Sequence, residues 1–318
     1  MQADTSEVAV SVVFGPVPVR RLGNCLFVDY VPPKCCNYSC TYCHSDRRPC
    51  HHLDRSALSD PEQVVKEVAA RVAEPGPRIS CVAIAADGEP TLDLHLGRII
   101  EGLAALGKPV AVLSNGTLLT RDDVRAELGQ ADFVSLTFDA ARPAAWQKVN
   151  APHPGLRFDT MLQGFRVFAA SYSGHLSTET MLIDGLNTST SELEATADFI
   201  SSLDPEVAFL AIPSGPQLTD ELRPPNRATV ERAAALFAER LRRIECLSVD
   251  VQNSADLTRG SGDGEAPFAA RRFGFYGHGN STVPLRPLAA GRPAAAIPVD
   301  AAISDSATSR CQSDRQRS

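Results

Sequence analysis

The 318-residue sequence lacks several features that would assign it to a class of protein at once. It contains no run of 18 apolar residues, so we expect no membrane-spanning helix and no membrane partner. Residues 1–7 are polar and acidic, which is not the pattern of a secretory signal peptide. Nine cysteines are too few for a disulfide framework in a chain of this length, and their odd number fits a reducing compartment. We therefore expect a cytoplasmic protein.

The chain also lacks an excess of positive charge. Its 31 Lys and Arg residues face 38 Asp and Glu residues, for a net charge of −7. A general nucleic-acid-binding protein is basic, so this class is not favoured. A local basic patch that recognises one RNA stays open, with Arg20, Arg21, Arg47 and Arg48 as its candidates. Hydrophobic residues make up 43% of the chain, enough for the core of one large α/β domain or two smaller ones.

The most informative stretch is a cysteine-rich loop. Cys36, Cys40 and Cys43 follow the spacing Cys-x3-Cys-x2-Cys, which lets three thiolates turn toward one compact metal centre. A closed structural zinc site needs four ligands, and most iron–sulfur clusters are held by four cysteines. Three thiolates on a four-iron cluster would leave one iron open for chemistry. Cys35 would give a different spacing, and we expect it to pack as a small apolar residue.

A second chemical element follows a predicted strand. Residues 79–86 are apolar along most of their length, which predicts a parallel strand buried on both faces. The strand leads into Asp87-Gly88-Glu89-Pro90-Thr91. Gly88 lets the backbone approach a ligand closely, and the Glu89 carboxylate can accept hydrogen bonds from an ammonium group. On its own such a turn is an ordinary connection between a strand and a helix.

Apolar strands alternate with helical segments along the middle of the chain. We expect strands at residues 26–31, 79–86, 109–113, 133–138, 175–183 and 207–212. We expect helices at residues 60–73, 94–106, 122–128, 158–169 and 191–202. This alternation predicts right-handed βαβ units and one curved parallel sheet.

The flanking segments carry weaker signals. Residues 8–14 are expected to form a strand or an extended lead-in, and the Pro- and Gly-rich residues 15–23 an irregular loop. Residues 45–58 are polar and basic, and we expect a flexible loop there rather than a second metal site at Cys50, His51 and His52.

Toward the C-terminus, a helix is expected at residues 229–243 and a last strand at 247–251. We expect a domain division into a lead-in (1–23), a core (24–215), a C-terminal helix and strand (216–258) and a loosely structured or disordered tail (259–318).

The two chemical elements together resemble the radical S-adenosylmethionine (radical SAM) superfamily. The cysteine triplet is similar to the superfamily's cluster loop, and the turn at 87–91 is similar to its Gly-Gly-Glu-Pro motif, with Asp87 in place of the first glycine. The resemblance implies an α/β fold with a partial (β/α)6 barrel, followed here by an irregular C-terminal extension. It also implies a [4Fe-4S] cluster on Cys36, Cys40 and Cys43, with SAM chelating the fourth iron.

The resemblance further implies which residues contact SAM. In the superfamily the Gly-Gly-Glu-Pro motif holds the SAM amino group, an aromatic residue at the place of Tyr42 lies against adenine, and polar residues at strand ends reach the rest. The implied SAM contacts are Tyr42, Asp87, Gly88, Glu89, Pro90, Ser114, Asn115, Asp139, Asp184 and Asn187. A single Ser or Asn at the start of a helix is more often a cap than a ligand.

A narrower resemblance covers residues 12–215. The stretches Phe14-Gly15-Pro16-Val17-Pro18 and Asn150-Ala151-Pro152-His153-Pro154 are similar to those of radical SAM proteins related to the wyosine-tRNA synthetases. Those enzymes use a second cluster on further N-terminal cysteines, whereas Cys25 is the sole cysteine before the loop here. The tRNA reaction is therefore not carried over.

The hypothesis is an enzyme that reductively cleaves SAM to a 5′-deoxyadenosyl radical, which abstracts hydrogen from an RNA base, a peptide or a small metabolite. It would need an electron donor such as flavodoxin or ferredoxin. Two alternatives stay open: a zinc-stabilised binding module without catalysis, and a degenerate superfamily member with a sensing or electron-transfer role. The sequence names no residue that acts on the substrate, and it assigns no function to Cys25, Cys35 or Cys50.

Overall fold

The computed structural model describes residues 11–19, 22–33, 35–43, 50–213 and 222–247. All of these residues belong to one compact unit, residues 1–282. The predicted tail (259–318), most of the last predicted strand (248–251) and the four candidate RNA-binding arginines lie outside the described residues.

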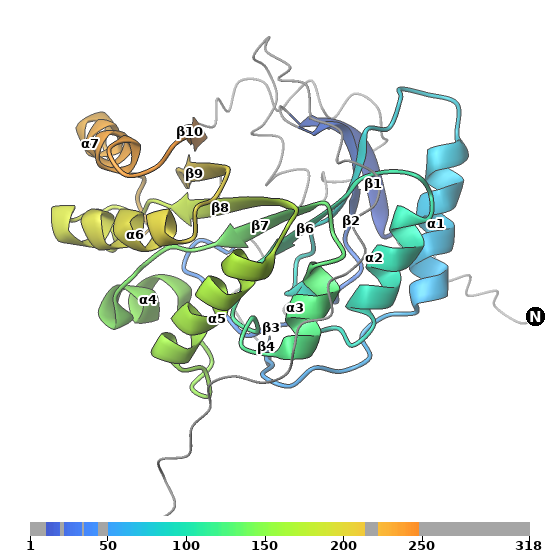
Figure 1. Cartoon of the computed structure of the whole chain (residues 1–318), viewed down its shortest axis with the longest axis horizontal. Helices are drawn as coiled ribbons and strands as arrows, with labels where there is room; N and C mark the ends of the chain where they lie inside the picture. The colour runs from blue at the N-terminus through green and yellow to red at the C-terminus, as the bar shows by residue number, and fades with distance from the viewer. Residues whose placement is uncertain (1–10, 20–21, 34, 44–49, 214–221, 248–318) are drawn as a thin grey trace, which may run out of the picture. The chain divides into compact units, whose positions relative to one another are not determined.

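An eight-stranded sheet forms the centre of this unit (Figure 1). Its order is β1-β2-β5-β6-β7-β8-β9-β10. β1 is antiparallel to β2, and every other neighbouring pair is parallel. The strands are β1 (Val13–Val19), β2 (Gly23–Val28), β5 (Cys81–Ile84), β6 (Val110–Ser114), β7 (Phe133–Thr137), β8 (His175–Met181), β9 (Val207–Ala211) and β10 (Ile244–Leu247). The six core strands predicted from the sequence are confirmed, and they lie in chain order, as successive parallel βαβ units require.

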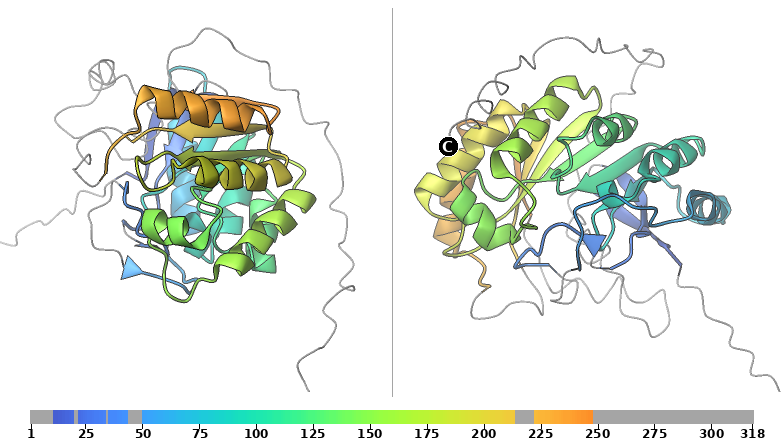
Figure 2. Two further views of the ribbon diagram at one scale, coloured as in Figure 1. Left: turned by 90° about the vertical axis from the view of Figure 1, so that its left-hand side faces the viewer. Right: turned by 90° about the horizontal axis from the view of Figure 1, so that it is seen from below.

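The helices are arranged along one face of the curved sheet, which remains open (Figure 2). They are α1 (Pro61–Ala73), α2 (Leu96–Ala104), α3 (Asp122–Leu128), α4 (Pro143–Asn150), α5 (Phe158–Ser171), α6 (Thr190–Ser202) and α7 (Arg227–Ala238). α1 begins as predicted, because Asp60 accepts hydrogen bonds from the backbone N–H groups of Glu62 and Gln63 and Pro61 fits the first turn. Within the described residues, no helix combines the length and apolar character needed to cross a membrane.

Both faces of the central strands are buried, as predicted for β5. Val82 and Ile84 pack into the main core together with helix residues such as Ile99 and Leu103. The alternate residues Cys81 and Ala83 pack into a second apolar cluster. Side chains of a strand alternate between faces, so the continuous apolar run covers both sides.

The structure corrects three expectations about the flanking segments. Residues 15–19 do not form a loop but belong to β1, whose register with β2 shifts between Phe14 and Val17. Proline is tolerated there because β1 lies at the edge of the sheet. α4 was not predicted, and α7 ends five residues before the predicted end, so that β10 begins at Ile244. The segment 50–58, expected to be a flexible loop, contributes strand β4 (Cys50–His51), which pairs with β3 (Cys35–Cys36).

Candidate functional site

The cysteine loop leaves the carboxyl end of β2 and is folded into a compact turn. The backbone N–H of Cys43 donates to the Cys40 carbonyl at 2.9 Å, and Ser39 N–H donates to the Asn150 carbonyl at 2.9 Å. Tyr38 is buried, and its hydroxyl accepts a hydrogen bond from Trp146 Nε1 at 2.7 Å. Cys36, Cys40 and Cys43 are half-buried, whereas Cys35 is buried, as expected for an apolar packing residue.

The three spaced thiols lie close enough for each to affect the pKa of another. Burial, followed by the charge of Glu89, raises the pKa of Cys36 to about 12, and the charge of Cys43 adds to this. Burial also raises the pKa of Cys40 well above its usual range, with further contributions from Asp139, Cys43 and Cys36. A positively charged metal centre would reverse this preference, because metal binding requires thiolates and releases their protons.

The described residues do not show the geometry of a single-metal site. A zinc ion needs its ligands to converge at about 2.0–2.3 Å from one point. Among the described residues, no three Cys, His, Asp or Glu side chains converge in this way. In an iron–sulfur cluster each cysteine binds a different iron, so three cysteine ligands need not converge on one point.

Glu89 joins the cysteine loop to the ends of two strands. Its backbone N–H donates to the Cys35 carbonyl at 2.8 Å. Glu89 is buried, with 3% of the residue exposed. Its carboxylate accepts four hydrogen bonds: from Thr91 N at 3.1 Å, Thr91 Oγ1 at 2.6 Å, Ser114 Oγ at 2.7 Å and Asn115 N at 2.8 Å. Burial raises the pKa of Glu89, and these donors oppose the rise. Three of these donors share Oε1, whereas Oε2 accepts from Asn115 N, so Oε2 keeps room for one more donor.

Gly88 lies where no larger residue fits. A Cβ atom at this position would come within 2.5 Å of Val31 Cγ1 and 2.6 Å of the Cys35 carbonyl oxygen. The glycine therefore brings the turn directly against the cysteine loop. Asp87 belongs to the same turn, and its backbone N–H donates to Asp29 Oδ1 at 3.0 Å. Pro90 is buried and begins the short helix η1 (Pro90–Leu92).

Arg55 also holds this turn, and sequence reasoning missed it. Its side chain is 3% exposed. Nε donates to the Thr91 carbonyl at 2.9 Å, Nη2 donates to the Asp93 carbonyl at 2.6 Å, and the guanidinium also pairs with Asp123 and Glu127 on α3. The acceptors come from distant parts of the chain, so no local pattern signals them.

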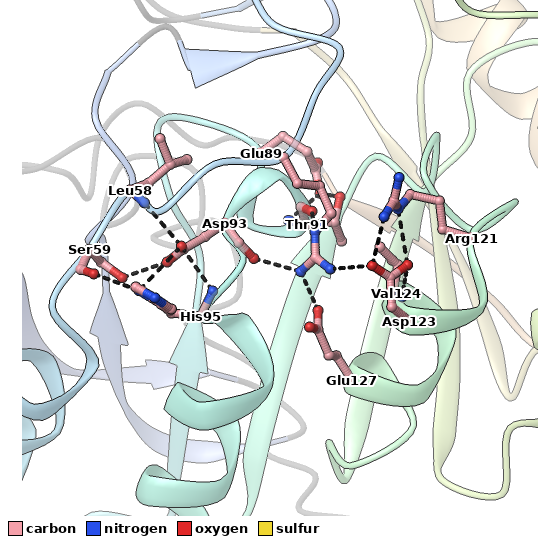
Figure 3. Close-up of polar contacts among 11 residues, drawn as sticks. Leu58, Ser59, Glu89, Thr91, Asp93, His95, Arg121, Asp123, Val124 and Glu127 are labelled. Carbon is pink, nitrogen blue, oxygen red and sulfur yellow. Dashed lines mark hydrogen bonds and ion pairs between the residues drawn. The ribbon is translucent and has the colours of Figure 1, made fainter.

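Asp93 extends the same network toward the start of α1. Its carboxylate accepts hydrogen bonds from the N–H groups of Leu58 and His95 and from the Ser59 hydroxyl (Figure 3). The residue is fully buried. The loop before α1 is thereby fastened to the turn that contains Glu89.

Two further predicted residues contact each other at the carboxyl end of β7. Asp139 Oδ2 accepts from Tyr42 Oη at 2.6 Å and from Asn150 Nδ2 at 2.6 Å, while Oδ1 accepts from Met181 N at 2.8 Å. Asp139 is 2% exposed, and burial raises its pKa to about 6 in spite of these donors.

The remaining predicted residues have different surroundings. The side chain of Asn187 makes its hydrogen bonds with backbone groups. Oδ1 accepts from Ile183 N at 2.8 Å, and Nδ2 donates to the carbonyls of Met181 and Asp139 at 2.7 and 2.9 Å. Asp184 is exposed and lines a hollow of about 410 Å³ together with Lys148 and Arg232. The structure thus gathers Tyr42, Glu89, Ser114, Asn115 and Asp139 around the cysteine loop. Asn187 contacts the Asp139 carbonyl, and Asp184 faces solvent.

Two asparagines complete the site without having been predicted as cofactor residues. Asn37 is fully buried, donates from Nδ2 to Thr117 Oγ1 at 2.6 Å and accepts from Asn115 Nδ2 at 2.8 Å. Asn150, the last residue of α4, lies between Asp139 and Cys40, with Nδ2 3.4 Å from Cys40 Sγ. The sequence motif that contains Asn150 was noted for its resemblance, but its contact with a cysteine depends on the unpredicted helix α4.

The family comparison agrees with this geometry. The model of the Radical SAM superfamily matches residues 30–200, a range that holds the cysteine loop, the Gly88–Glu89 turn and the strand ends around them. The chain belongs to the Radical SAM superfamily. The resemblance predicted from the sequence is confirmed, as is an α/β fold in which the mostly parallel sheet forms an open, partial barrel.

The chain is also similar to curated relatives in sequence and to solved structures in fold. It is 33% identical over 231 residues to the UPF0026 protein MJ1312 of Methanocaldococcus jannaschii, and the match covers 72% of each chain. It is 32% identical over 197 residues to a UPF0026 protein of Helicobacter pylori strain J99. That match covers 61% of this chain and 63% of the relative, a little under two thirds of its length. A structure of TYW1 with a lysine-pyruvate adduct bound shares the fold, with a TM-score of 0.54 and 18% identity over 68% of this chain and 74% of TYW1. Membership of the superfamily supports an enzymatic function and implies an iron–sulfur cluster and SAM.

Proposed function

We propose that this protein is a radical SAM enzyme in which Cys36, Cys40 and Cys43 hold a [4Fe-4S] cluster with one iron left for SAM. When bound, the cluster and SAM supply a 5′-deoxyadenosyl radical that abstracts a hydrogen atom from the substrate. The observation that carries the proposal is the direct connection between the cysteine loop and the Gly88–Glu89 turn, through the 2.8 Å hydrogen bond from Glu89 N–H to the Cys35 carbonyl.

The protein's own residues position these two elements rigidly. Glu89 fixes Ser114 and Asn115 at the carboxyl end of β6, and Arg55 fixes the backbone of Thr91 and Asp93 behind the turn. Polar groups held by buried partners need little reorganisation when a charged ligand binds. The carboxyl ends of parallel strands are where (β/α) barrel folds carry their chemistry.

The polar residues around the loop are proposed to bind SAM in two ways. Backbone carbonyls of the Asp87–Pro90 turn and Glu89 Oε2 would hold the amino group, because Oε1 already accepts from Thr91 and Ser114. Tyr42 would lie against the adenine ring, with its hydroxyl anchored on Asp139. The substrate is proposed to be an RNA base, a peptide or a small metabolite, with a small electron-transfer protein such as flavodoxin or ferredoxin as the donor.

The test is anaerobic purification and reconstitution with iron and sulfide, followed by incubation with SAM and dithionite. We expect brown protein with about four irons per chain, visible absorbance and release of 5′-deoxyadenosine. Cys40→Ala should abolish the cluster, whereas the matched control Cys246→Ala, which changes an exposed cysteine on β10, should keep it. Colourless protein with one zinc would show the binding module instead, and a cluster without 5′-deoxyadenosine release would show the sensing or electron-transfer member.

A further inference from the structure

Two asparagine amides are directed at sulfur atoms of the cysteine loop. Asn150 Nδ2 lies 3.4 Å from Cys40 Sγ, and Asn115 Nδ2 lies 3.6 Å from Cys36 Sγ. Sulfur is a weak acceptor in a thiol and a stronger one when it carries negative charge. These contacts connect side chains from α4 and from the end of β6 with two of the three spaced cysteines.

The surrounding hydrogen bonds determine which end of each amide faces the sulfur. Asn150 Nδ2 also lies 2.6 Å from Asp139 Oδ2, and that oxygen is an acceptor when the carboxylate is ionised. Asn115 Oδ1 accepts from Thr117 N at 3.0 Å and from Thr117 Oγ1 at 2.8 Å, which leaves the NH2 end toward Cys36. In both residues the partners require the N–H donors, not the oxygen, to point at the cysteine.

Each asparagine is fixed by a buried carboxylate. Asp139 binds the Asn150 side chain, and Glu89 binds the Asn115 backbone N–H at 2.8 Å. The two carboxylate residues are 2% and 3% exposed, and the asparagines are 2% and 9% exposed. Little water can compete for these amides, so their N–H groups are held toward the sulfurs even before a ligand binds.

We infer that Asn115 and Asn150 donate hydrogen bonds to the cysteine sulfurs that hold the cluster and thereby raise its reduction potential. Asp139 and Glu89 act as positioning residues for the two amides. This inference rests on the proposed function, because it requires a cluster on Cys36 and Cys40. Reduction adds negative charge to the cluster and its sulfurs, and an N–H donor stabilises the more negative state. The negative charges of Asp139 and Glu89 would lower the reduction potential of the cluster, and the two asparagine amides offset this lowering.

The test compares Asn150→Leu and Asn115→Leu with Thr178→Val. Leucine removes the donor at similar volume. Thr178 is a matched buried polar control on β8, since it is fully buried and its hydroxyl has no hydrogen-bond partner among the described residues. The readout is the reduction potential of the cluster, from a titration followed by electron paramagnetic resonance at equal iron content.

We expect each leucine variant to have a more negative potential than the wild type, so that the ratio of reduced to oxidised cluster at a fixed solution potential falls about three- to tenfold. Thr178→Val should match the wild type. A potential that is unchanged or more positive in both leucine variants would overturn the inference. A role limited to packing would reduce iron content or stability without moving the potential of the clusters that form.

A measurement on the unsubstituted holoprotein keeps the inference testable if a variant takes up no cluster. Labelling of the asparagine side-chain amides with ¹⁵N, which leaves the backbone nitrogen of Asn37 next to Cys36 unlabelled, should give a magnetic coupling between the label and the reduced cluster in electron–nuclear double resonance, and its absence would overturn the inference. The two proposals fail separately. If the wild-type protein binds no cluster or does not cleave SAM, the proposed function is wrong. If the wild type is active but the variants have unaltered reduction potentials, only the role of the asparagines is wrong.

Discussion

The Tyr42 hydroxyl donates a 2.6 Å hydrogen bond to Asp139 Oδ2, although the two residues lie 97 positions apart. Tyr42 precedes Cys43 in the cysteine loop, and Asp139 follows β7. Through Asn150 the same carboxylate also reaches Cys40. One buried acid at a strand end therefore holds two points of the loop, and the order of this loop should depend on it.

Tyr42→Phe is expected to destabilise the fold by about 1–3 kcal/mol, because it removes a donor from a buried acceptor. It should also raise the pKa of Asp139 above its value of about 6, since the hydrogen bond from Tyr42 that opposes the effect of burial would be lost. Urea unfolding of the cluster-free protein measures the stability. In a double-mutant cycle with Asp139→Asn the two effects should be coupled. Tyr172→Phe, which removes a 2.9 Å bond to the Ala131 carbonyl, is the matched control and should show no coupling to Asp139.

Gly88→Ala is expected to impair both the fold of the turn and the binding of SAM. The added Cβ would lie 2.6 Å from a backbone oxygen of the cysteine loop and 2.5 Å from Val31 Cγ1, so the loop and the turn must separate. Overpacking of this kind costs about 1–3 kcal/mol. Calorimetric titration of the reconstituted protein with SAM measures the binding. Gly76→Ala, where a Cβ would meet nothing within 4 Å, should leave both properties unchanged, and equal behaviour of the two variants would contradict the close-approach argument.

Arg55→Leu should destabilise the protein by about 3–5 kcal/mol, because it leaves buried acceptors of the Glu89 turn and α3 without their donor. Arg55→Lys should not restore stability fully, since a lysine cannot reproduce the planar, forked donor set. Thermal and urea unfolding measure both. The control Arg98→Leu removes an ion pair with Glu62 whose side chains are 58% and 71% exposed, and it should change stability by no more than about 1 kcal/mol. Similar losses for Arg55 and Arg98 would show that the Arg55 network is not structural.

Asp29 should make the cluster-free protein less stable as pH rises. Burial raises the pKa of this carboxyl from 3.8 to about 7, with the nearby Asp87 charge adding to the rise. The folded state therefore keeps its proton at pH values where the unfolded state has released it. The stabilising contribution is complete below about pH 4 and is lost as pH rises through about 7.

Asp29→Asn is the test of this pH dependence, since the amide oxygen can still accept the hydrogen bond from Asp87 N–H. Urea unfolding between pH 4.5 and 7.5 should show that the wild type loses stability relative to Asp29→Asn as pH rises. A constant difference between the two proteins across this range would show that the carboxyl does not titrate there.

Local patterns were sufficient for much of the fold. Continuous apolar runs such as residues 79–86 predict strands covered on both faces, and α1 carries its own start signals in Asp60 and Pro61. β1 could not be recognised in the same way, because Pro16 and Pro18 normally interrupt a strand and are acceptable here only at the edge of the sheet. α4 is short, and its position depends on burying Trp146 and Val149 against other elements.

The sequence by itself determined the superfamily and predicted the candidate site residues, and the tertiary structure decided how those residues are held in place. Cys36, Cys40 and Cys43 lie within eight residues, and Gly88 and Glu89 are adjacent, so spacing along the chain is enough to predict them as site residues. The hydrogen bonds from Asn115 and Asn150 to cysteine sulfur, the anchoring of Tyr42 on Asp139 and the grip of Arg55 on the turn join residues 36 to 110 positions apart. Such contacts form when strand ends, the end of α4 and the loop before α1 meet in the folded chain, and no local pattern of residues encodes which of them will meet.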